Sequence, residues 1–214
     1  MIKRIIFDID NTLIKWQSAS FDFLPNFLSK HGIQPSKENV DRFINSSETF
    51  IVDDKILTRA DYIAKINDEN NANFLDEDFH EAFTSMALNN IAPIDLKQVA
   101  TLKYLASKYE IYILTNWFSD YQALRLEKIG ISEYIDEVYG FDDYYAKPSK
   151  EAFQRVCEGL DPSECLMIGD SETFDLEPAL EMGMQVIKLD LTGRLPRNKN
   201  IKNIKHINEL IDIL

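Results

Sequence analysis

Positive charge is scarce in this sequence. Its 214 residues include 23 lysines and arginines against 36 aspartates and glutamates, which gives a formal net charge of −13. Non-specific binding of nucleic acid needs a basic face that displaces counterions, so the deficit argues against a nucleic-acid partner. It leaves room for an anionic small molecule, because a bound metal ion or a single lysine can reverse the local field inside a cleft.

Cysteine and long apolar runs are scarce too. Cys157 and Cys165 form no metal-spaced pair, which is typical of a reduced cytoplasmic protein. The stretch MIKRIIFDID has too few apolar residues before its acids for a signal peptide, and no segment is long enough for a membrane span. We therefore expect a cytoplasmic protein with no membrane partner.

What the sequence does have is a regular alternation of strand-like and helix-like segments. Apolar runs that predict strands occupy residues 3–8, 110–116, 136–141, 164–170 and 184–190, with helical periodicity between the later ones. Two of these helices begin with the spacing of a capping box, Asp95 with Gln98 and Ser119 with Gln122. Strands that alternate with helices of this length predict an α/β fold, a Rossmann-like doubly wound parallel sheet.

Residues 16–90 interrupt the alternation. They have the pattern of several helices, and we predict no strand among them. The sheet therefore begins with the first strand, is interrupted by an all-helical insertion, and resumes near residue 110. We expect an α/β core of residues 1–15 and 91–214 with a helical cap domain of residues 16–90, and a closing amphipathic helix over residues 204–214.

Polar side chains follow the predicted strands at the points where the chain leaves the sheet. They are Asp8 and Asp10 after the first strand, Thr115 and Asn116 after the second, Lys147 past the third, and Asp170 and Asp175 after the fourth. Each motif alone is common in turns and helix caps. Because ligands bind beyond the carboxyl ends of parallel strands, all of them are expected to gather in one crevice. Their joint occurrence in this order indicates a functional site.

The stretches FDIDNTL, ILTN, KP and GDSETFD resemble, in this order, the four motifs of the haloacid dehalogenase superfamily, and the insertion resembles its helical cap. The resemblance extends from residue 5 to about residue 190. Asn11 stands where glycine is commonest, and we expect it to adopt the left-handed conformation that the turn requires. Pro178 is compatible with its helix only within the first turn.

The resemblance implies a role for each carboxylate. Asp8 is the implied nucleophile, which forms an aspartyl-phosphate, and Asp10 is the implied acid and then base. Asp170 is expected to hold Mg²⁺ together with the Asp8 carboxylate and the Asp10 backbone carbonyl. Asp175 is expected to contact the metal or the lysine, although an ordinary residue at a helix N-terminus would look the same.

The remaining motif residues are implied to bind the phosphate. Thr115 and Asn116 are expected to donate hydrogen bonds to phosphoryl oxygens. Lys147 is expected to neutralise the phosphate and to keep the aspartates from repelling one another. Outside the motifs, Trp117 and Trp16 fit either the entrance of the site or core packing, and Lys55 and Arg59 fit either a second anionic group of the substrate or solvated charges.

The expected activity is Mg²⁺-dependent hydrolysis of a small phosphorylated metabolite, of the nucleotide or sugar-phosphate type. Dehalogenating members of the superfamily lack the acid/base aspartate, so Asp10 argues against cleavage of a carbon–halogen bond. A phosphomutase would keep the same residues and remains an alternative within enzymes. From a different class, the alternative is a non-catalytic module that binds a phosphorylated ligand or a protein.

Overall fold

The computed structural model describes residues 1–15, 21–47, 51–52, 55–89, 91, 94–140, 146–191 and 201–214. Trp16 lies outside these residues, and so do both ends of the predicted cap domain, at residues 16 and 90.

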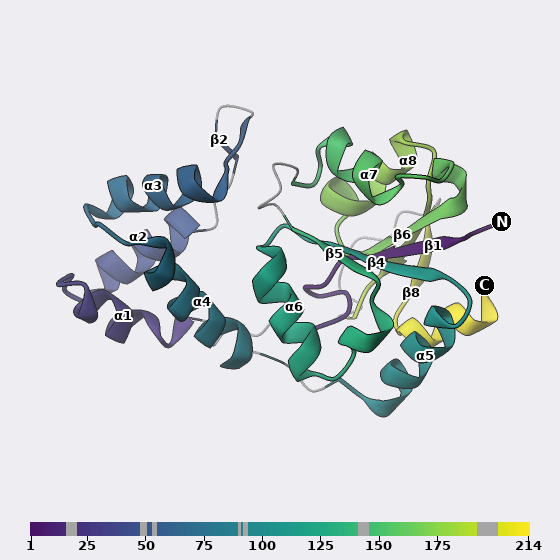
Figure 1. Ribbon diagram of the computed structural model, residues 1–214, viewed down its shortest axis with the longest axis horizontal. Coiled ribbons are helices and arrows are strands. Elements are labelled where there is room, and N and C mark those ends of the chain that lie inside the picture. Colours follow the sequence, from purple (N-terminus) through teal and green to yellow (C-terminus); the bar gives the residue numbers. More distant parts are fainter. Residues whose placement is uncertain are drawn as a thin grey trace.

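A six-stranded sheet forms the centre of the larger part of the molecule (Figure 1). Its strand order is β5-β4-β1-β6-β7-β8, and every neighbouring pair is parallel. The strands are β1 (Arg4–Phe7), β4 (Glu110–Leu114), β5 (Glu137–Tyr139), β6 (Cys165–Gly169), β7 (Gln185–Leu189) and β8 (Lys202–Ile204). The predicted doubly wound parallel sheet is confirmed.

Successive residues of each strand point to opposite faces of the sheet, and each face has its own apolar cluster. In β1, Ile5 and Phe7 lie in one cluster and Ile6 lies in the other. The first face is covered by α5 (Leu96–Ala106), α6 (Ser119–Lys128) and the 3₁₀ helix η6 (Ile207–Asp212), and the second by α7 (Lys150–Val156) and α8 (Glu177–Glu181). Both faces are buried, which explains why the central strands β1 and β6 are buried along their whole length without a polar alternation.

The helical region lies to one side of the sheet in Figure 1. It contains α1 (Leu24–Lys30), α2 (Lys37–Ser47), α3 (Arg59–Asn70) and α4 (Asp76–Asn89). The prediction that it holds no strand is wrong, because β2 (Ile51–Val52) and β3 (Lys55–Ile56) form an antiparallel pair. Strands of two residues are too short to produce a recognisable period in the sequence.

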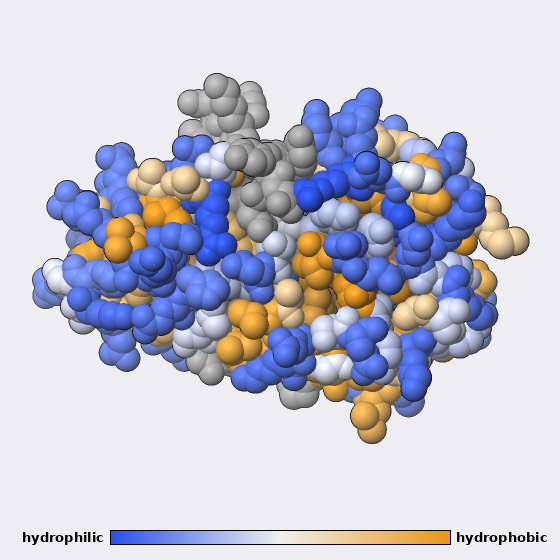
Figure 2. Space-filling view, in the orientation of Figure 1, coloured by the Kyte–Doolittle hydropathy of each residue, from blue (hydrophilic) through white to orange (hydrophobic). Residues whose placement is uncertain are grey.

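Aromatic side chains form the core of the helical region and its contact with the sheet domain. Phe27, Phe43 and Phe79 are buried between the helices, with ring centroids about 6 Å apart. Helix α4 packs against α6, where the ring centroids of Phe83 and Tyr121 are 6.1 Å apart. Hydrophilic side chains cover much of the face shown in Figure 2, with hydrophobic side chains between them.

The C-terminal segment differs from its prediction. The expected amphipathic helix over residues 204–214 is instead the end of β8 followed by the 3₁₀ helix η6. Ile204, Ile207 and Leu210 are buried on the first face of the sheet. The apolar pattern therefore did indicate a segment that packs on the sheet, but the segment is mainly a 3₁₀ helix, which is tighter than an α-helix. Among the described residues, no helix combines the length and the apolar character that crossing a bilayer requires.

Two short helical segments and one π-helix complete the described chain. They are the 3₁₀ helices η2 (Ser132–Tyr134) and η4 (Pro162–Glu164) and the π-helix η5 (Glu172–Leu176), which continues directly into α8. Pro178 lies in the first turn of α8, as expected. The capping box of Asp95 and Gln98 is present at the start of α5, and Gly130 follows α6 with a φ of 74°.

Candidate active site

The site lies where the direction of strand addition reverses. β1 is central: β4 and β5 add on one side of it, and β6, β7 and β8 add on the other. Asp8 directly follows β1, and Asp170 directly follows β6, so the two carboxylates flank this switch point. Such a point is where open parallel sheets leave a crevice for ligands.

A tight turn after β1 places Asp10 beside this crevice. The backbone N–H groups of Thr12, Leu13 and Ile14 all donate to the Ile9 carbonyl, at 3.2, 2.9 and 2.9 Å. Asn11 has a φ of 61°, the left-handed conformation predicted for it. The turn thus keeps both aspartates at the end of the strand.

Lys147 is buried between two aspartates. Its Nζ donates to Asp8 Oδ1 at 2.7 Å and to Asp175 Oδ1 at 2.6 Å. Only 3% of the lysine side chain is exposed. Burial by itself would lower the pKa of Lys147, but Asp175 and Asp8 outweigh it, and the pKa is raised. The predicted contact between Asp175 and the lysine is therefore present.

Three carboxylates lie close together beyond the ends of β1 and β6. Asp8, Asp170 and Asp175 each offer an oxygen atom within 4.8 Å of the others. Burial raises the pKa of Asp8 to about 7, with Asp175 and Asp10 adding to the effect and Lys147 opposing it. Burial and the Asp175 charge raise the pKa of Asp170 to about 6. The group thus carries more negative charge than one lysine balances.

This arrangement fits a divalent cation such as Mg²⁺. Carboxylate oxygens are its preferred protein ligands, and a cation would offset the repulsion that adds to the effect of burial on both pKa values. Gly169 leaves room for the cluster: a Cβ atom there would lie 2.3 Å from Asp175 Oδ2. Glycine at this position is therefore required by the approach of Asp175.

Asp10 differs from the other three aspartates. It was predicted to contact the metal through its backbone carbonyl, and its carboxylate has other partners. Its Oδ2 accepts a hydrogen bond from Gln122 Nε2 at 3.0 Å, and its Oδ1 lies 2.7 Å from Arg125 Nη2 in an ion pair. A metal contact through the Asp10 backbone carbonyl stays a prediction.

Gln122 and Arg125 are the site residues that the motifs did not reveal. Gln122 was predicted to form a capping box with Ser119, and this is wrong: α6 begins after Phe118, which makes no side-chain cap. Gln122 Nε2 instead donates to Asp10 and, at 3.0 Å, to Thr115 Oγ1. The sequence contained one signal that could have identified them: two polar residues stand three positions apart on the helix face that packs against the sheet.

The remaining motif residues contact the same group of side chains. Thr115 is 2% exposed and lies at the end of β4. The Asn116 side chain donates to the Lys147 carbonyl at 2.8 Å and accepts from the Lys147 backbone N–H at 2.8 Å. Asn116 therefore holds Lys147 in place, and its contact with a phosphoryl oxygen stays a prediction.

The structure also places the residues considered for substrate contact. Arg59 bonds to Asp76, Asp120 and the Tyr121 hydroxyl, so it links α3 and α4 to α6. Trp117 packs against Phe83, with ring centroids 5.1 Å apart, at the contact between α4 and α6. The Lys55 side chain lies outside the described residues.

Comparison with known proteins decides the family. The model of the haloacid dehalogenase-like hydrolases matches residues 2–183. The chain belongs to this family. In this haloacid dehalogenase-like hydrolase, Asp8, Thr115 and Asp170 directly follow β1, β4 and β6, and Lys147 reaches Asp8 from a segment beyond β5.

Several members of the family are similar to the chain. N-acylneuraminate-9-phosphatase of Mus musculus is 25% identical over 213 residues, covering 91% of this chain and 85% of that protein. Pyrimidine 5′-nucleotidase YjjG of Escherichia coli is 30% identical over 119 residues, about half of each chain at 54% and 52%. The HAD-hydrolase YfnB of Bacillus subtilis, solved with bound magnesium, shares the fold with a TM-score of 0.70 at 18% identity, covering 99% of this chain and 98% of that one.

Proposed function

We propose that the chain is a Mg²⁺-dependent phosphatase that hydrolyses a small phosphorylated metabolite through an aspartyl-phosphate on Asp8. The observation that carries the proposal is the different environment of two neighbouring aspartates. Asp8 lies against Lys147 and two further carboxylates, whereas Asp10 is held by an amide and a guanidinium. Two carboxylates with different partners can perform two different roles.

In the first step, an oxygen of Asp8 attacks the phosphorus atom. A bond forms between Asp8 and phosphorus, the bond from phosphorus to the leaving oxygen breaks, and Asp10 gives its proton to that oxygen. In the second step, water attacks the aspartyl-phosphate, Asp10 takes the proton of the water, and Asp8 is released. One group that acts as acid and then as base closes the cycle.

The other residues bind and orient the phosphoryl group. Lys147 offers its third ammonium hydrogen to a phosphoryl oxygen while the other two hold Asp8 and Asp175. Thr115 offers its hydroxyl hydrogen, and Asn116 keeps Lys147 in position. When bound by Asp8, Asp170 and Asp175, Mg²⁺ would supply positive charge to the equatorial oxygens.

The substrate class rests on the relatives. One acts on N-acylneuraminate 9-phosphate by its name, and another is a pyrimidine 5′-nucleotidase, so nucleotides and sugar phosphates are the compounds to test. We further propose that residues 1–15 and 91–214 form the catalytic core and that residues 16–90 form a cap that selects the substrate. A cytoplasmic location stays a prediction from the composition.

The proposal is tested by measuring phosphate release from a panel of nucleotides and sugar phosphates, with and without Mg²⁺. We expect release that requires the metal and that falls below about a thousandth of the wild-type rate in Asp8→Asn. The matched control is Asp41→Asn, which removes an exposed carboxylate in α2 that pairs with Lys37, and should leave release unchanged.

Each contrary result points to one alternative. Robust release by Asp8→Asn would exclude the covalent mechanism. Transfer of phosphate between carbons of a sugar, without release, would show a phosphomutase. Binding of the compounds with neither release nor transfer would show a non-catalytic binding module.

A further inference from the structure

We propose that Gln122 and Arg125 are positioning residues for the reaction, and that they fix the two groups of the site that lie nearest to α6, Asp10 and Thr115. The inference rests on the proposed function, since it assigns Asp10 to proton transfer. It adds two residues of α6, outside the four motifs, to the machinery of the site.

Burial is the first observation in its favour. Gln122 is 0% exposed and Arg125 is 3% exposed, on the helix face that covers the sheet. Burying an amide and a guanidinium is unfavourable unless both find partners, and an apolar residue would serve packing equally well. Their presence in this position therefore calls for a function beyond packing.

The direction of the hydrogen bonds is the second observation. Arg125 Nη1 donates to Gln122 Oε1 at 2.7 Å. A guanidinium can only donate, so the Gln122 oxygen must face Arg125, and its Nε2 must face the crevice. Arg125 thereby sets the orientation of the Gln122 amide.

Both hydrogens of this amide are then used on the site. One goes to Asp10 Oδ2 and the other to Thr115 Oγ1, each at 3.0 Å. Because the Thr115 oxygen accepts from Gln122, its own hydroxyl hydrogen is left to donate to a phosphoryl oxygen. The amide thus determines how Thr115 presents itself to the substrate.

The Asp10 carboxylate is held at both oxygens. Gln122 binds Oδ2, and the Arg125 guanidinium lies 2.7 Å from Oδ1. Two contacts from one helix face restrict the rotation of this side chain, which is 28% exposed. Proton transfer requires a donor and an acceptor in a narrow geometry, so a carboxylate that rotates freely transfers its proton less often.

The experiment compares two substrates in variants Gln122→Met and Arg125→Met, with Mg²⁺ present. One substrate is the fastest alkyl phosphate of the panel, whose leaving oxygen needs a proton, and the other is p-nitrophenyl phosphate, whose leaving group departs without one. We expect kcat/KM for the alkyl phosphate to fall by roughly 100-fold, because misplacing a catalytic group by about 1 Å has an effect of this size. For p-nitrophenyl phosphate we expect a clearly smaller fall, because general-acid catalysis matters little for a good leaving group and only the orientation of Thr115 is lost.

A second readout follows from the second step. Asp10 must also take the proton of the attacking water, so the variants should break down the aspartyl-phosphate slowly. With p-nitrophenyl phosphate, stopped-flow absorbance should show a burst of p-nitrophenol equal to the enzyme concentration, followed by slow turnover. Loss of packing alone would not produce a burst.

Arg4→Met is the matched control for the loss of a buried arginine. Arg4 is 6% exposed and bonds to Glu110 and to the carbonyls of Val156 and Glu158, at the other end of β1 from Asp8. We expect Arg4→Met to change kcat/KM by the same factor for both substrates, and to show no burst of p-nitrophenol. If Arg125→Met does not fold, the positioning role is tested with Gln122→Met alone.

Equal losses for both substrates in a folded Gln122→Met, without a burst, would overturn the positioning role. Failure of the proposed function is recognised separately, because the wild-type protein would then hydrolyse neither substrate.

Discussion

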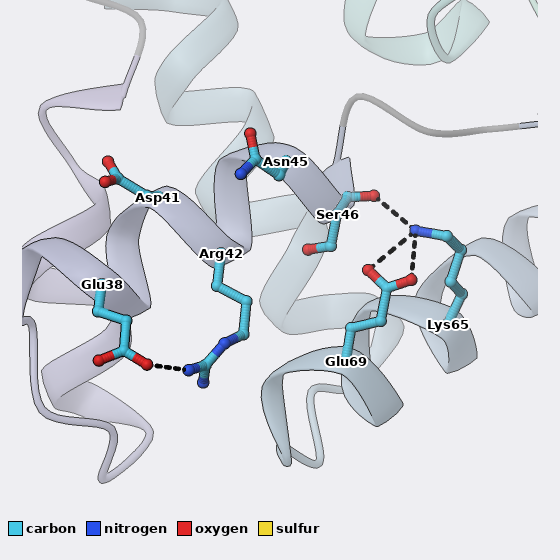
Figure 3. Close-up of a pocket in the computed structure, with 7 residues that line it drawn as sticks. All are labelled: Glu38, Asp41, Arg42, Asn45, Ser46, Lys65 and Glu69. Atoms are coloured by element: carbon cyan, nitrogen blue, oxygen red, sulfur yellow. Dashed lines mark hydrogen bonds and ion pairs between the residues drawn. The ribbon is translucent and has the colours of Figure 1, made fainter.

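Two of the clusters of acidic and basic side chains in the described part of the chain have opposite surroundings. The first is the active-site cluster of Asp8, Lys147, Asp170 and Asp175 at the end of the sheet. The second lines a groove of about 550 Å³ between α2 and α3, where Arg42 pairs with Glu38 and Lys65 pairs with Glu69 (Figure 3). We call the second cluster the helical-region groove.

The two clusters use the same kinds of residue at similar distances. Arg42 Nη2 is 2.7 Å from Glu38 Oε1, the same separation as Lys147 Nζ and Asp8 Oδ1. The side chains of Arg42 and Glu38 are 42% and 80% exposed, however, against 3% and 9% for Lys147 and Asp8. Water screens the first pair and barely reaches the second, so burial, and not contact distance, decides which cluster can perform chemistry.

Removal of one partner from the buried cluster should have the largest effect. Lys147→Met leaves Asp8 and Asp175 buried without their counter-charge. In metal-free buffer we expect the free energy of unfolding to fall by about 3–5 kcal/mol, measured by urea denaturation, with loss of phosphate release. Arg42→Met in the helical-region groove should lower it by about 0–1 kcal/mol. Equal losses in the free energy of unfolding for Lys147→Met and Arg42→Met would contradict the conclusion that burial distinguishes the two clusters.

Binding of Mg²⁺ should have the next largest effect. A saturating concentration, 100 times the dissociation constant, is expected to add about 2.7 kcal/mol to the free energy of unfolding. The rise in Tm should disappear in Asp170→Asn and persist in Glu69→Gln, which removes a carboxylate from the helical-region groove. A rise of the same size in both variants would place the metal elsewhere.

The metal-free protein should also respond to pH in a defined direction. Asp8 and Asp170 have pKa values raised to about 7 and about 6, so the folded chain binds more protons than the unfolded chain. Their contribution to stability is therefore full below pH 4 or so, the range of unfolded aspartate, and is lost as the pH rises through 6 and 7. The stabilisation by Mg²⁺ should accordingly be larger near pH 8 than near pH 5.

A steric change in the cluster should have an intermediate effect. In Gly169→Ala the new Cβ would lie 2.3 Å from Asp175 Oδ2, so the carboxylate must move. We expect a loss of about 1–3 kcal/mol in urea denaturation, and weaker binding of Mg²⁺ by calorimetry.

Gly183→Ala is the control for this substitution. Gly183 has a φ of 86° and no atom within 4 Å of the new Cβ, so backbone strain should lower stability by about 1–2 kcal/mol without changing the affinity for Mg²⁺. An unchanged affinity in Gly169→Ala would mean that Asp175 does not contribute to the metal site.

The smallest effect is expected in the helical-region groove. Glu38→Gln breaks an exposed pair one helical turn apart, and should lower the free energy of unfolding by about 0.3–0.5 kcal/mol at low salt. In about 1 M NaCl the difference in the free energy of unfolding between Glu38→Gln and the wild type should vanish. At this salt concentration the Debye length is only about 3 Å, so salt ions screen the attraction between exposed charges. If the difference in the free energy of unfolding persists in high salt, the pair of Arg42 and Glu38 is less accessible to solvent than the exposed fractions of its side chains indicate.

Much of the site was predictable from local patterns. Asp8, Asp170 and Lys147 follow apolar runs that could be recognised as strands, and parallel strands bring their carboxyl ends together. Asn11 was identified because few residues tolerate the left-handed conformation that the turn needs. The position of Pro178 in the first turn of α8 followed from the same kind of rule.

Other features could not be predicted, because their partners are distant in the sequence or their elements are too short. Gln122 had the spacing of a capping residue, yet its partner Asp10 lies 112 positions away. Arg59 looked like a free cation for a substrate, but Asp120 and Tyr121, about 60 positions later, hold it at the contact with α6. The strands β2 and β3 have two residues each, too few to show a period.

The sequence by itself determined the α/β class, the order of the strand-end motifs and the chemistry of their side chains. These depend on periodicity and on rules that act over a few residues. Only the tertiary structure decided that the Asp10 carboxylate contacts Gln122 and Arg125, and that Arg59 contacts α6. Such contacts form when helices pack onto a sheet, and packing joins residues that no local pattern connects.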